Sequence, residues 1–128
     1  RLSYVIEKNS IKNAVPKLDL HMTVALGDCE SADYEPFKFD ILPLRVEFNR
    51  IQVTKNMLGT YDLIITSQDQ RLQRLHDDVC DHYKIKHYYS SYLPHITLAH
   101  NYPQGQTIGF EPMDIAFTYP IVDKKREY

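Results

Sequence analysis

The chain has 128 residues, of which 43% are hydrophobic and 12% aromatic, which is enough apolar material for the core of one domain. Charged residues make up 25% and the formal net charge is -2, so the overall charge does not attract nucleic acid and any phosphate site must be local. There is no apolar run of the roughly 18 residues that a membrane helix needs, and no signal-like N-terminus. We therefore expect a single domain over residues 1–128 that has no membrane partner.

The first residue and the cysteines bear on the setting of this domain. The sequence begins with Arg1 rather than Met, so we expect a fragment of a larger polypeptide in which the domain is monomeric. Cys29 and Cys80 form neither a disulfide framework nor a zinc-binding motif. Two isolated thiols favour a reducing, cytoplasmic location.

Three segments in the first half of the chain predict strands. Residues 2–7 are rich in β-branched and aromatic side chains. Residues 18–26 alternate, and Gly27 and Asp28 are expected to end this strand. Its polar face carries Asp19, His21, Thr23 and Ala25. Residues 44–54 change their apolar face near Asn49, which predicts a bulge or turn there.

One helix is predicted after a further strand. Residues 61–66 follow a turn at Gly59 and have the composition of a strand. Ser67 and Gln70 then form a capping box that would open a helix. The apolar side chains of this helix recur at spacings of three and four residues, at Leu72, Leu75, Val79 and Tyr83.

Two more strands complete the predicted elements. Residues 93–100 alternate, and residues 114–122 contain Pro120, which places the last strand at a sheet edge or shortens it. Strands outnumber helices, and no parallel βαβ unit is indicated. We therefore predict an α+β fold with mainly antiparallel sheet.

The pattern His-x-Thr occurs twice, as His21-Met22-Thr23 and as His95-Ile96-Thr97, each within a predicted strand. Residues two apart in a strand project from the same face, so each copy presents an imidazole beside a hydroxyl. A single copy would more often be a structural pair within a strand. Two matched copies favour a functional interpretation.

A phosphodiester suits this pair of motifs. In-line displacement at phosphorus puts the attacking and leaving oxygens on opposite sides, so one imidazole can act as general base and the other as general acid. We therefore predict that His21 and His95 are catalytic and that Thr23 and Thr97 bind the phosphate through their hydroxyls. Unperturbed imidazole has a pKa of about 6.5, so both protonation states are accessible near neutral pH. The chemistry invokes no metal and no cofactor, and it leaves open which histidine is the base.

The two motifs, within His-Met-Thr-Val and Pro-His-Ile-Thr-Leu-Ala, resemble the paired signatures of the two-histidine (2H) phosphoesterase superfamily. The resemblance extends over nearly the whole chain. It implies a bilobal fold in which two mainly antiparallel β-sheets line a central cleft, with helices outside and the motif side chains projecting into the cleft. It also implies phosphodiesterase activity on 2',3'-cyclic phosphates or 2',5'-linked oligoadenylates.

Within this superfamily, the chain looks most like the viral 2',5'-phosphodiesterase domains, a group that includes the C-terminal domain of the rotavirus capping protein. The short length and the tyrosine-rich loop before the second motif carry this likeness. It implies cleavage of 2',5'-oligoadenylate in the host cytoplasm, which would antagonise the host ribonuclease that this messenger activates. The sequence departs from cellular members because the segment after the first motif lacks a long amphipathic helix.

Two alternatives to this function remain open. One is an RNA-end or 2',3'-cyclic nucleotide phosphodiesterase of the same superfamily, and the other is a catalytically silent nucleotide-binding module. The nucleophile is also open. An internal 3'-hydroxyl, which we favour because it is already in place, would give a 2',3'-cyclic phosphate, whereas water would hydrolyse the ester directly.

Several further residues are candidates for substrate contacts. Tyr92 and Tyr89 are predicted to stack on an adenine, with capping of the sheet edge as the alternative. Additional phosphate contacts, or ordinary solvated charges, are considered at Arg45, Lys84 and Lys86.

The remaining histidines are expected to be non-catalytic. His76 and His82 do not share a helical face, so we expect surface residues rather than a metal site with His87 and the neighbouring aspartates. His100 is expected on the strand face opposite to His95.

Overall fold

Antiparallel strands and one helix make up the described part of the chain, which is therefore α+β as predicted. The computed structural model describes residues 14–16, 20–29, 35–56, 58–87, 91–103 and 109–121. Its elements are β1 (Gly27–Cys29), β2 (Leu44–Phe48), β3 (Arg50–Lys55), β4 (Tyr61–Thr66), α2 (Gln70–Tyr83), β5 (Ile85–His87), β6 (His95–Ala99) and β7 (Met113–Phe117). The strand predicted at residues 2–7 lies outside the described residues.

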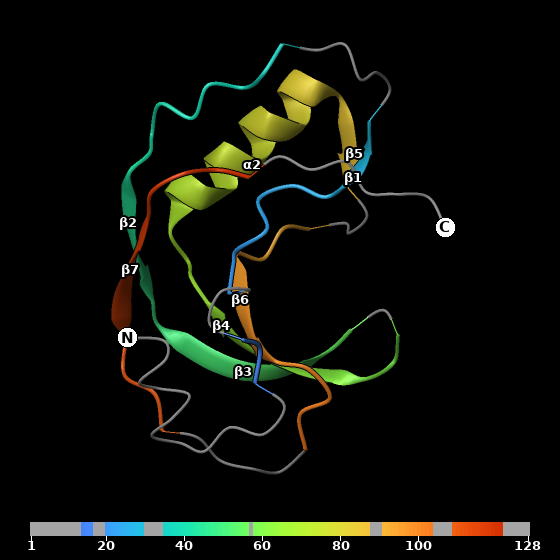
Figure 1. Ribbon diagram of the computed structural model, residues 1–128, viewed down its shortest axis with the longest axis vertical. Helices are drawn as coiled ribbons and strands as arrows, with labels where there is room; N and C mark the ends of the chain where they lie inside the picture. Colours follow the sequence, from blue (N-terminus) through green and yellow to red (C-terminus); the bar gives the residue numbers. More distant parts are fainter. Residues whose placement is uncertain are drawn as a thin grey trace.

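The described strands form three small sheets. One sheet has the order β3-β4-β6, and the other two are the pairs β2–β7 and β1–β5. In the view of Figure 1, α2 lies between the β2–β7 pair on the left and the β1–β5 pair on the right, with the three-stranded sheet below. None of the helices in the described ranges is long and apolar enough to cross a membrane.

The strands β2 and β3 follow each other directly and change partners at Asn49, where a bulge or turn was predicted. Leu44, Val46 and Phe48 are buried while the residues between them are exposed, as their alternation predicts. The backbone N–H of Asn49 donates to the carbonyl of Thr66 at 3.1 Å, which marks the transfer from β7 to β4. The predicted second apolar face is only partly buried, because Ile51 packs against the core but Val53 is 38% exposed.

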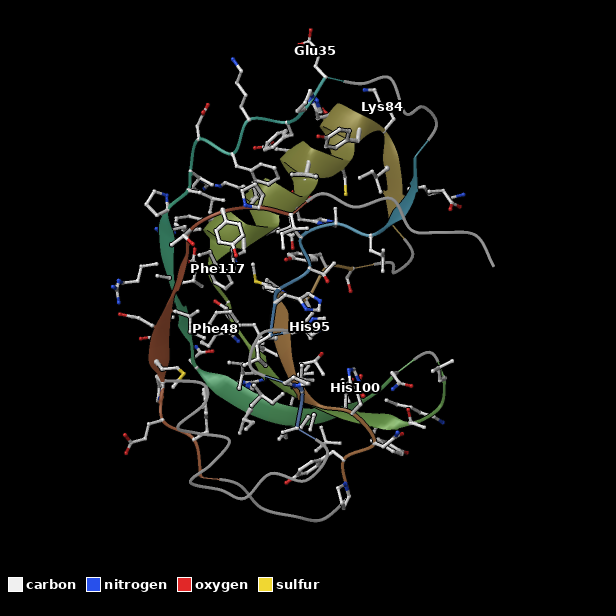
Figure 2. All side chains as sticks on the ribbon, viewed as in Figure 1. Glu35, Phe48, Lys84, His95, His100 and Phe117 are labelled. Atoms are coloured by element: carbon white, nitrogen blue, oxygen red, sulfur yellow. The ribbon has the colours of Figure 1, made fainter. Side chains whose placement is uncertain are left out.

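The core is built on β4, the central strand of the three-stranded sheet. This strand covers the predicted residues 61–66 and follows the predicted turn at Gly59, whose φ of +84° is readily adopted by glycine. Residues 62–66 are all buried, because β3 and β6 flank the strand on either side. The aromatic rings of Phe48 on β2 and Phe117 on β7 lie near each other, with centroids 6.1 Å apart and planes tilted by 49° (Figure 2). The buried core cluster comprises Leu44, Val46, Phe48, Leu63, Ile65, Leu72, Ile96, Leu98, Ala99 and Tyr102.

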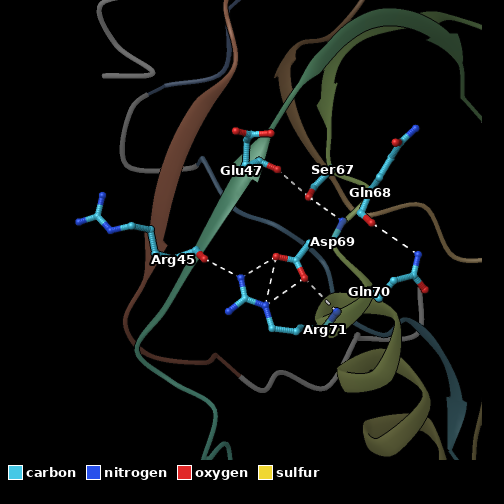
Figure 3. Close-up of polar contacts among 7 residues, drawn as sticks. All are labelled: Arg45, Glu47, Ser67, Gln68, Asp69, Gln70 and Arg71. Atoms are coloured by element: carbon cyan, nitrogen blue, oxygen red, sulfur yellow. Dashed lines mark hydrogen bonds and ion pairs between the residues drawn. The ribbon is translucent and has the colours of Figure 1, made fainter.

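The helix α2 begins at Gln70, and its N-cap is Asp69 rather than the predicted Ser67. The Asp69 carboxylate accepts the backbone N–H of Arg71 at 2.9 Å and is also bound by the Arg71 guanidinium at 2.6 Å (Figure 3). The hydrogen bond from the Arg71 side chain holds the pKa of Asp69 below its ordinary value. A carboxylate is the stronger cap here because it satisfies a helix N–H and a guanidinium together.

Ser67 instead connects β2 to the start of α2. Its hydroxyl donates to the carbonyl of Glu47 at 2.7 Å and accepts the N–H of Asp69 at 3.1 Å. The Arg71 guanidinium adds a second link by donating to the Arg45 carbonyl at 2.9 Å. The first turn of α2 is therefore fixed to β2 at two points (Figure 3).

The buried face of α2 contains Leu72, Leu75 and Val79, as predicted, and also His76, which was wrongly expected at the surface. His76 is 8% exposed, because positions 72, 76 and 79 share one helical face. The helix ends at Tyr83 and is capped by Lys84, whose φ of 54° is left-handed and whose backbone N–H donates to the Cys80 carbonyl.

The first His-x-Thr motif does not lie in a regular strand. Residues 20–26 were predicted as part of a strand. In the described structure, Met22 alone among them pairs with another strand, through an isolated bridge to Ile96. The prediction that Gly27 and Asp28 end a strand is wrong, since they begin β1 and pair with β5. The physical reason is a change of partner, because this segment leaves the edge of β6 and joins β5.

The last two strands are shorter than predicted. The strand expected at residues 93–100 is β6, which begins after Pro94, a residue without a backbone donor. The strand expected at residues 114–122 is β7, which begins at Met113 and ends at Phe117, before Pro120.

Candidate active site

The second motif lies on β6 with the alternation that the sequence predicts. Ile96 and Leu98 are buried in the core, whereas His95 and Thr97 are half-buried on the other face. Figure 2 shows His95 at the start of β6 and His100 just beyond its end. His100 Nδ1 lies 3.1 Å from Asp62 Oδ1, so His100 has a partner of its own away from His95.

The bridge between Met22 and Ile96 brings the first motif beside the second. Residues that flank a bridge in antiparallel pairing lie opposite each other and project to the face opposite to the bridge pair. Regular pairing on both sides of this bridge would put His21 beside Thr97 and Thr23 beside His95. Each imidazole would then have the hydroxyl of the other motif as its neighbour.

The two histidines occupy diagonal positions in this arrangement. Diagonal neighbours in an antiparallel pair are about 7 to 8 Å apart, a separation across which two imidazoles can reach one bound group. Met22 packs against the core together with Ile96, whereas His21 is exposed and Thr23 and Thr97 are half-buried. In that arrangement the four motif side chains would share a face that a ligand can reach from solvent.

His95 is held in one tautomer. Its Nδ1 lies 2.8 Å from the carbonyl of Leu93, and a carbonyl can only accept, so Nδ1 carries the hydrogen. Nε2 is then the nitrogen that takes up or releases a proton. This is the arrangement that general acid or base catalysis requires of an imidazole.

Two side chains hold the main chain of the first motif. The Tyr92 hydroxyl donates to the carbonyl of Thr23 at 2.8 Å, and His76 Nδ1 donates to the carbonyl of Val24 at 2.6 Å. The His76 and Tyr92 rings are stacked, with centroids 4.2 Å apart and planes 1° apart. Burial raises the pKa of Tyr92, so the phenol stays protonated and remains a donor.

Sequence reasoning missed His76, although a signal was present. His76 lies four residues after Leu72 and three before Val79, the spacing of the apolar face of α2. A polar residue on such a face needs a hydrogen-bond partner when it is buried. Its partner, a backbone carbonyl far away in the sequence, could not be read from the pattern.

The predicted stacking residues are placed in part. One ring face of Tyr92 is covered by His76, so a base would stack on the opposite face. Tyr89 lies outside the described residues. Base stacking by either tyrosine stays a prediction.

The motif face continues onto β4. In the β4–β6 register, Thr66 lies opposite His95 and Ile64 lies opposite Thr97. Both β4 residues are buried and lie beside the second motif on the same face of the sheet. The Thr66 hydroxyl is a further polar group next to His95 that the sequence alone did not single out.

The basic residues considered for phosphate contacts have other surroundings. Arg45 is exposed on β2. Lys84 lies at the end of α2, well away from His95 in Figure 2, and its Nζ is 4.0 Å from Asp81. Lys86 is paired across the strands with Asp28. The structure does not gather these three cations around the motifs.

The candidate metal site on α2 is not assembled by its described residues. His76 is directed to Val24, whereas His82 bonds the carbonyl of Glu35. Within the described ranges, no cluster of three or more metal-ligating side chains is present. The side chain of His87 lies outside the described residues.

A surface depression of about 500 Å³ lies beside α2 and β5 rather than at the motifs. It is lined by Asp77, Asp78, Cys80, Asp81, Lys84 and Ile85. Three carboxylates against one cation repel a phosphate group. This depression is therefore unsuited to the ligand that the two motifs favour.

Comparison with known proteins gives no independent assignment. No protein-family model matches the sequence, and no curated protein matches it significantly. The two motifs and the bridge that brings them together are therefore the features of this chain that bear on its function.

Proposed function

We propose that this protein is a metal-independent phosphodiesterase that cleaves 2',5'-linked oligoadenylates with His21 and His95 as a general acid–base pair. The single observation that carries the proposal is the bridge between Met22 and Ile96. Two His-x-Thr copies far apart in the sequence are neighbours through this bridge, on the face opposite to the core. A structural role for either motif alone gives no reason for this coincidence.

The proposed reaction uses the free 3'-hydroxyl beside a 2',5' linkage. One imidazole removes the proton of this hydroxyl, whose oxygen attacks phosphorus, and the bond to the 5'-oxygen breaks. The other imidazolium protonates the departing 5'-oxygen. The products are a 2',3'-cyclic phosphate and a chain with a free 5'-hydroxyl.

The threonines stabilise the charge that develops during this displacement. Thr23 and Thr97 donate their hydroxyl hydrogens to the non-bridging phosphoryl oxygens, each from beside the histidine of the other motif. The tautomer of His95 supports the scheme, because its Nε2 is the exchanging nitrogen. Adenine recognition by Tyr92 or Tyr89 belongs to the same proposal.

The finer architecture is also proposed. The first motif leads into β1, which pairs with β5, and the second belongs to the three-stranded sheet. We propose that these parts form two lobes with the substrate cleft between them. In the cytoplasm of an infected host, such a domain within a larger viral protein would remove the activator of the host ribonuclease.

The test is turnover of three substrates in excess chelator. The protein is incubated with 2',5'-triadenylate, its 3',5' isomer and 2',3'-cyclic AMP, and the products are separated by chromatography. We expect cleavage of the 2',5' isomer and a cyclic phosphate product. His100→Ala is the matched control, because it removes an imidazole near the other end of β6 that is bonded to Asp62.

Each other outcome overturns a defined part of the proposal. Turnover of the cyclic nucleotide alone would indicate an enzyme that processes RNA ends. Binding without turnover of any substrate would indicate a silent nucleotide-binding module. Loss of activity in chelator, with recovery on adding a divalent cation, would contradict the metal-independent mechanism.

A further inference from the structure

The first motif is anchored mainly through its main chain. Met22 bridges to β6, but residues 20–26 form no continuous ladder, and the chain bends at Val24. The carbonyls of Thr23 and Val24 are therefore bonded by side chains instead of by a neighbouring strand. Shielded backbone acceptors need such partners.

The two donors come from different parts of the fold and support each other. Tyr92 precedes the second motif, and His76 lies on the buried face of α2. Their rings are stacked at 4.2 Å, and Cys80 Sγ lies 3.8 Å from both nitrogens of His76. We call His76 and Tyr92 the clamp. It connects α2, the segment before β6 and the first motif through two hydrogen bonds and one ring stack.

We propose that His76 and Tyr92 are positioning residues that set the first motif against the second through the carbonyls of Thr23 and Val24. The clamp bonds the carbonyls of the consecutive residues Thr23 and Val24, two and three residues after His21. Its kinetic consequences depend on the proposed phosphodiesterase activity. Its structural consequences do not depend on that activity. The positioning role and the phosphodiesterase activity can therefore be refuted separately.

Tyr92→Phe is the first test, because it keeps the stacked ring and removes the hydroxyl that Thr23 accepts from. Sub-ångström to ångström displacements of reacting groups cost about 10- to 100-fold in rate. We expect kcat for 2',5'-triadenylate to fall by about this factor, while KM changes less than about threefold. A fall in stability with kcat and KM unchanged would overturn the positioning role.

Tyr102→Phe is the matched control. Tyr102 is also a buried tyrosine, and its hydroxyl has no hydrogen-bond partner among the described residues. It packs in the core cluster and does not belong to the motif face. We expect its kcat to equal that of the wild type, and an equal loss of kcat in both variants would contradict the proposal.

His76 provides a second and independent variant. His76→Phe keeps an aromatic ring for stacking but lacks the Nδ1 donor. We expect His76→Phe to lower kcat about as much as Tyr92→Phe, and the double variant to lose less than the product of the two factors, because both bonds hold one segment. Fully multiplicative losses would show that the two residues act separately and would overturn the clamp.

A spectroscopic measurement tests the clamp without any activity. Imidazole ¹⁵N signals are recorded by NMR for the wild type, Tyr92→Phe and Tyr102→Phe. We expect the His21 signals to shift in Tyr92→Phe alone, and the His100 signals to stay constant in all three. If the wild type turns over no substrate but these shifts occur, the phosphodiesterase proposal fails and the clamp stands. Unchanged His21 signals would overturn the clamp whatever the activity.

Discussion

The two catalytic candidates reach the same face by different means. His95 starts a regular strand and is oriented by the carbonyl of Leu93. His21 lies on an irregular segment whose place is set by the neighbouring bridge of Met22. A side chain on an irregular segment depends more on its surroundings than one on a ladder, which is why the contacts around Thr23 matter for His21.

The motif residues give the first prediction. Replacing His21 or His95 by Ala removes one proton transfer, and each step contributes about 10²- to 10⁴-fold to the rate. We expect turnover to fall at least 10²-fold in either variant and by less in Thr23→Ala or Thr97→Ala. Stability should change little because these side chains are exposed or half-buried. Steady-state kinetics with urea denaturation as the folding control checks this, and wild-type rates in either histidine variant would refute the assignment.

A second prediction concerns the cap of α2. Asp69→Ala removes the acceptor for the Arg71 N–H and should cost about 1 kcal/mol of unfolding free energy. Asp69→Asn should cost less, because an amide oxygen still caps the helix. The folded-state pKa of Asp69 is depressed below 3.8, so its ionic contribution is present above pH 3.8 and disappears as pH falls through the lower folded value. The stability difference between wild type and Asp69→Asn should therefore narrow in acid, as measured by urea denaturation at several pH values.

Single residues also show what sequence reasoning can and cannot supply. The paired motifs could be recognised because the pattern His-x-Thr occurs twice in the sequence itself. The cap could not be assigned, because Ser67 and Asp69 are both good N-caps and the choice depends on Arg71 and on the carbonyl of Glu47. His76 was misplaced because its partner is Val24, 52 residues away.

At the scale of elements, β6 is the strand on which core and motif meet. One face carries Ile96 and Leu98 into the core, and the other carries His95 and Thr97. It pairs with β4 on one side and with the first motif on the other. Damage to its apolar face is therefore expected to affect folding before it affects chemistry.

A matched pair of leucine substitutions provides the third prediction. Leu98 is 0% exposed in the core, and Leu58 in the β3–β4 turn is 90% exposed. Leu98→Ala should lower the free energy of unfolding by about 2 to 5 kcal/mol through lost burial and a cavity. Leu58→Ala should change it by less than about 0.5 kcal/mol. Chemical denaturation measures both, and similar effects at the two sites would contradict the placement of β6.

A strand or helix could be predicted where the local sequence pattern determines it. It could not be predicted where the choice of a pairing strand determines it. Residues 61–66 and the two halves of 44–54 form the strands expected. Burial follows the sequence alternation in β2, whereas β4 is a continuous apolar run that is buried on both faces. Residues 18–26 also alternate, yet their chain makes one bridge to β6 and then moves to β5. The periodicity of a sequence indicates which face of a strand is buried, but it does not indicate which strand lies beside it.

At the scale of the whole molecule, the connections between the three small sheets are the feature of interest. The β2–β7 pair and the β3-β4-β6 sheet are continuous through Asn49, and the first motif links β6 to the β1–β5 pair. The sequence predicted the α+β class because strand composition is local. It did not predict the division into three sheets, because that depends on where strands change partners.

Amide hydrogen exchange gives the fourth prediction. Amides of β4 should exchange most slowly, because this strand is central and buried, and those of residues 20–26 should exchange fast. A slowly cleaved 2',5'-oligoadenylate analogue should protect residues 20–26 and β6 while leaving β2 and β7 unchanged. Mass spectrometry of peptic fragments reads this out. Equal protection over all strands, or none near the motifs, would argue against binding at this face.

The antiparallel bridge between Met22 and Ile96 relates the two motifs by a local twofold axis. A rotation by half a turn carries the first histidine onto the second and exchanges the threonines. In the proposed reaction, the entering and departing oxygens of the phosphate therefore meet equivalent groups, and reversing the reaction only exchanges the two roles. Direction must then come from groups that break this equivalence. These are the Leu93 carbonyl, which bonds the His95 ring, and the stacked His76 and Tyr92, which bond the main chain at Thr23 and Val24.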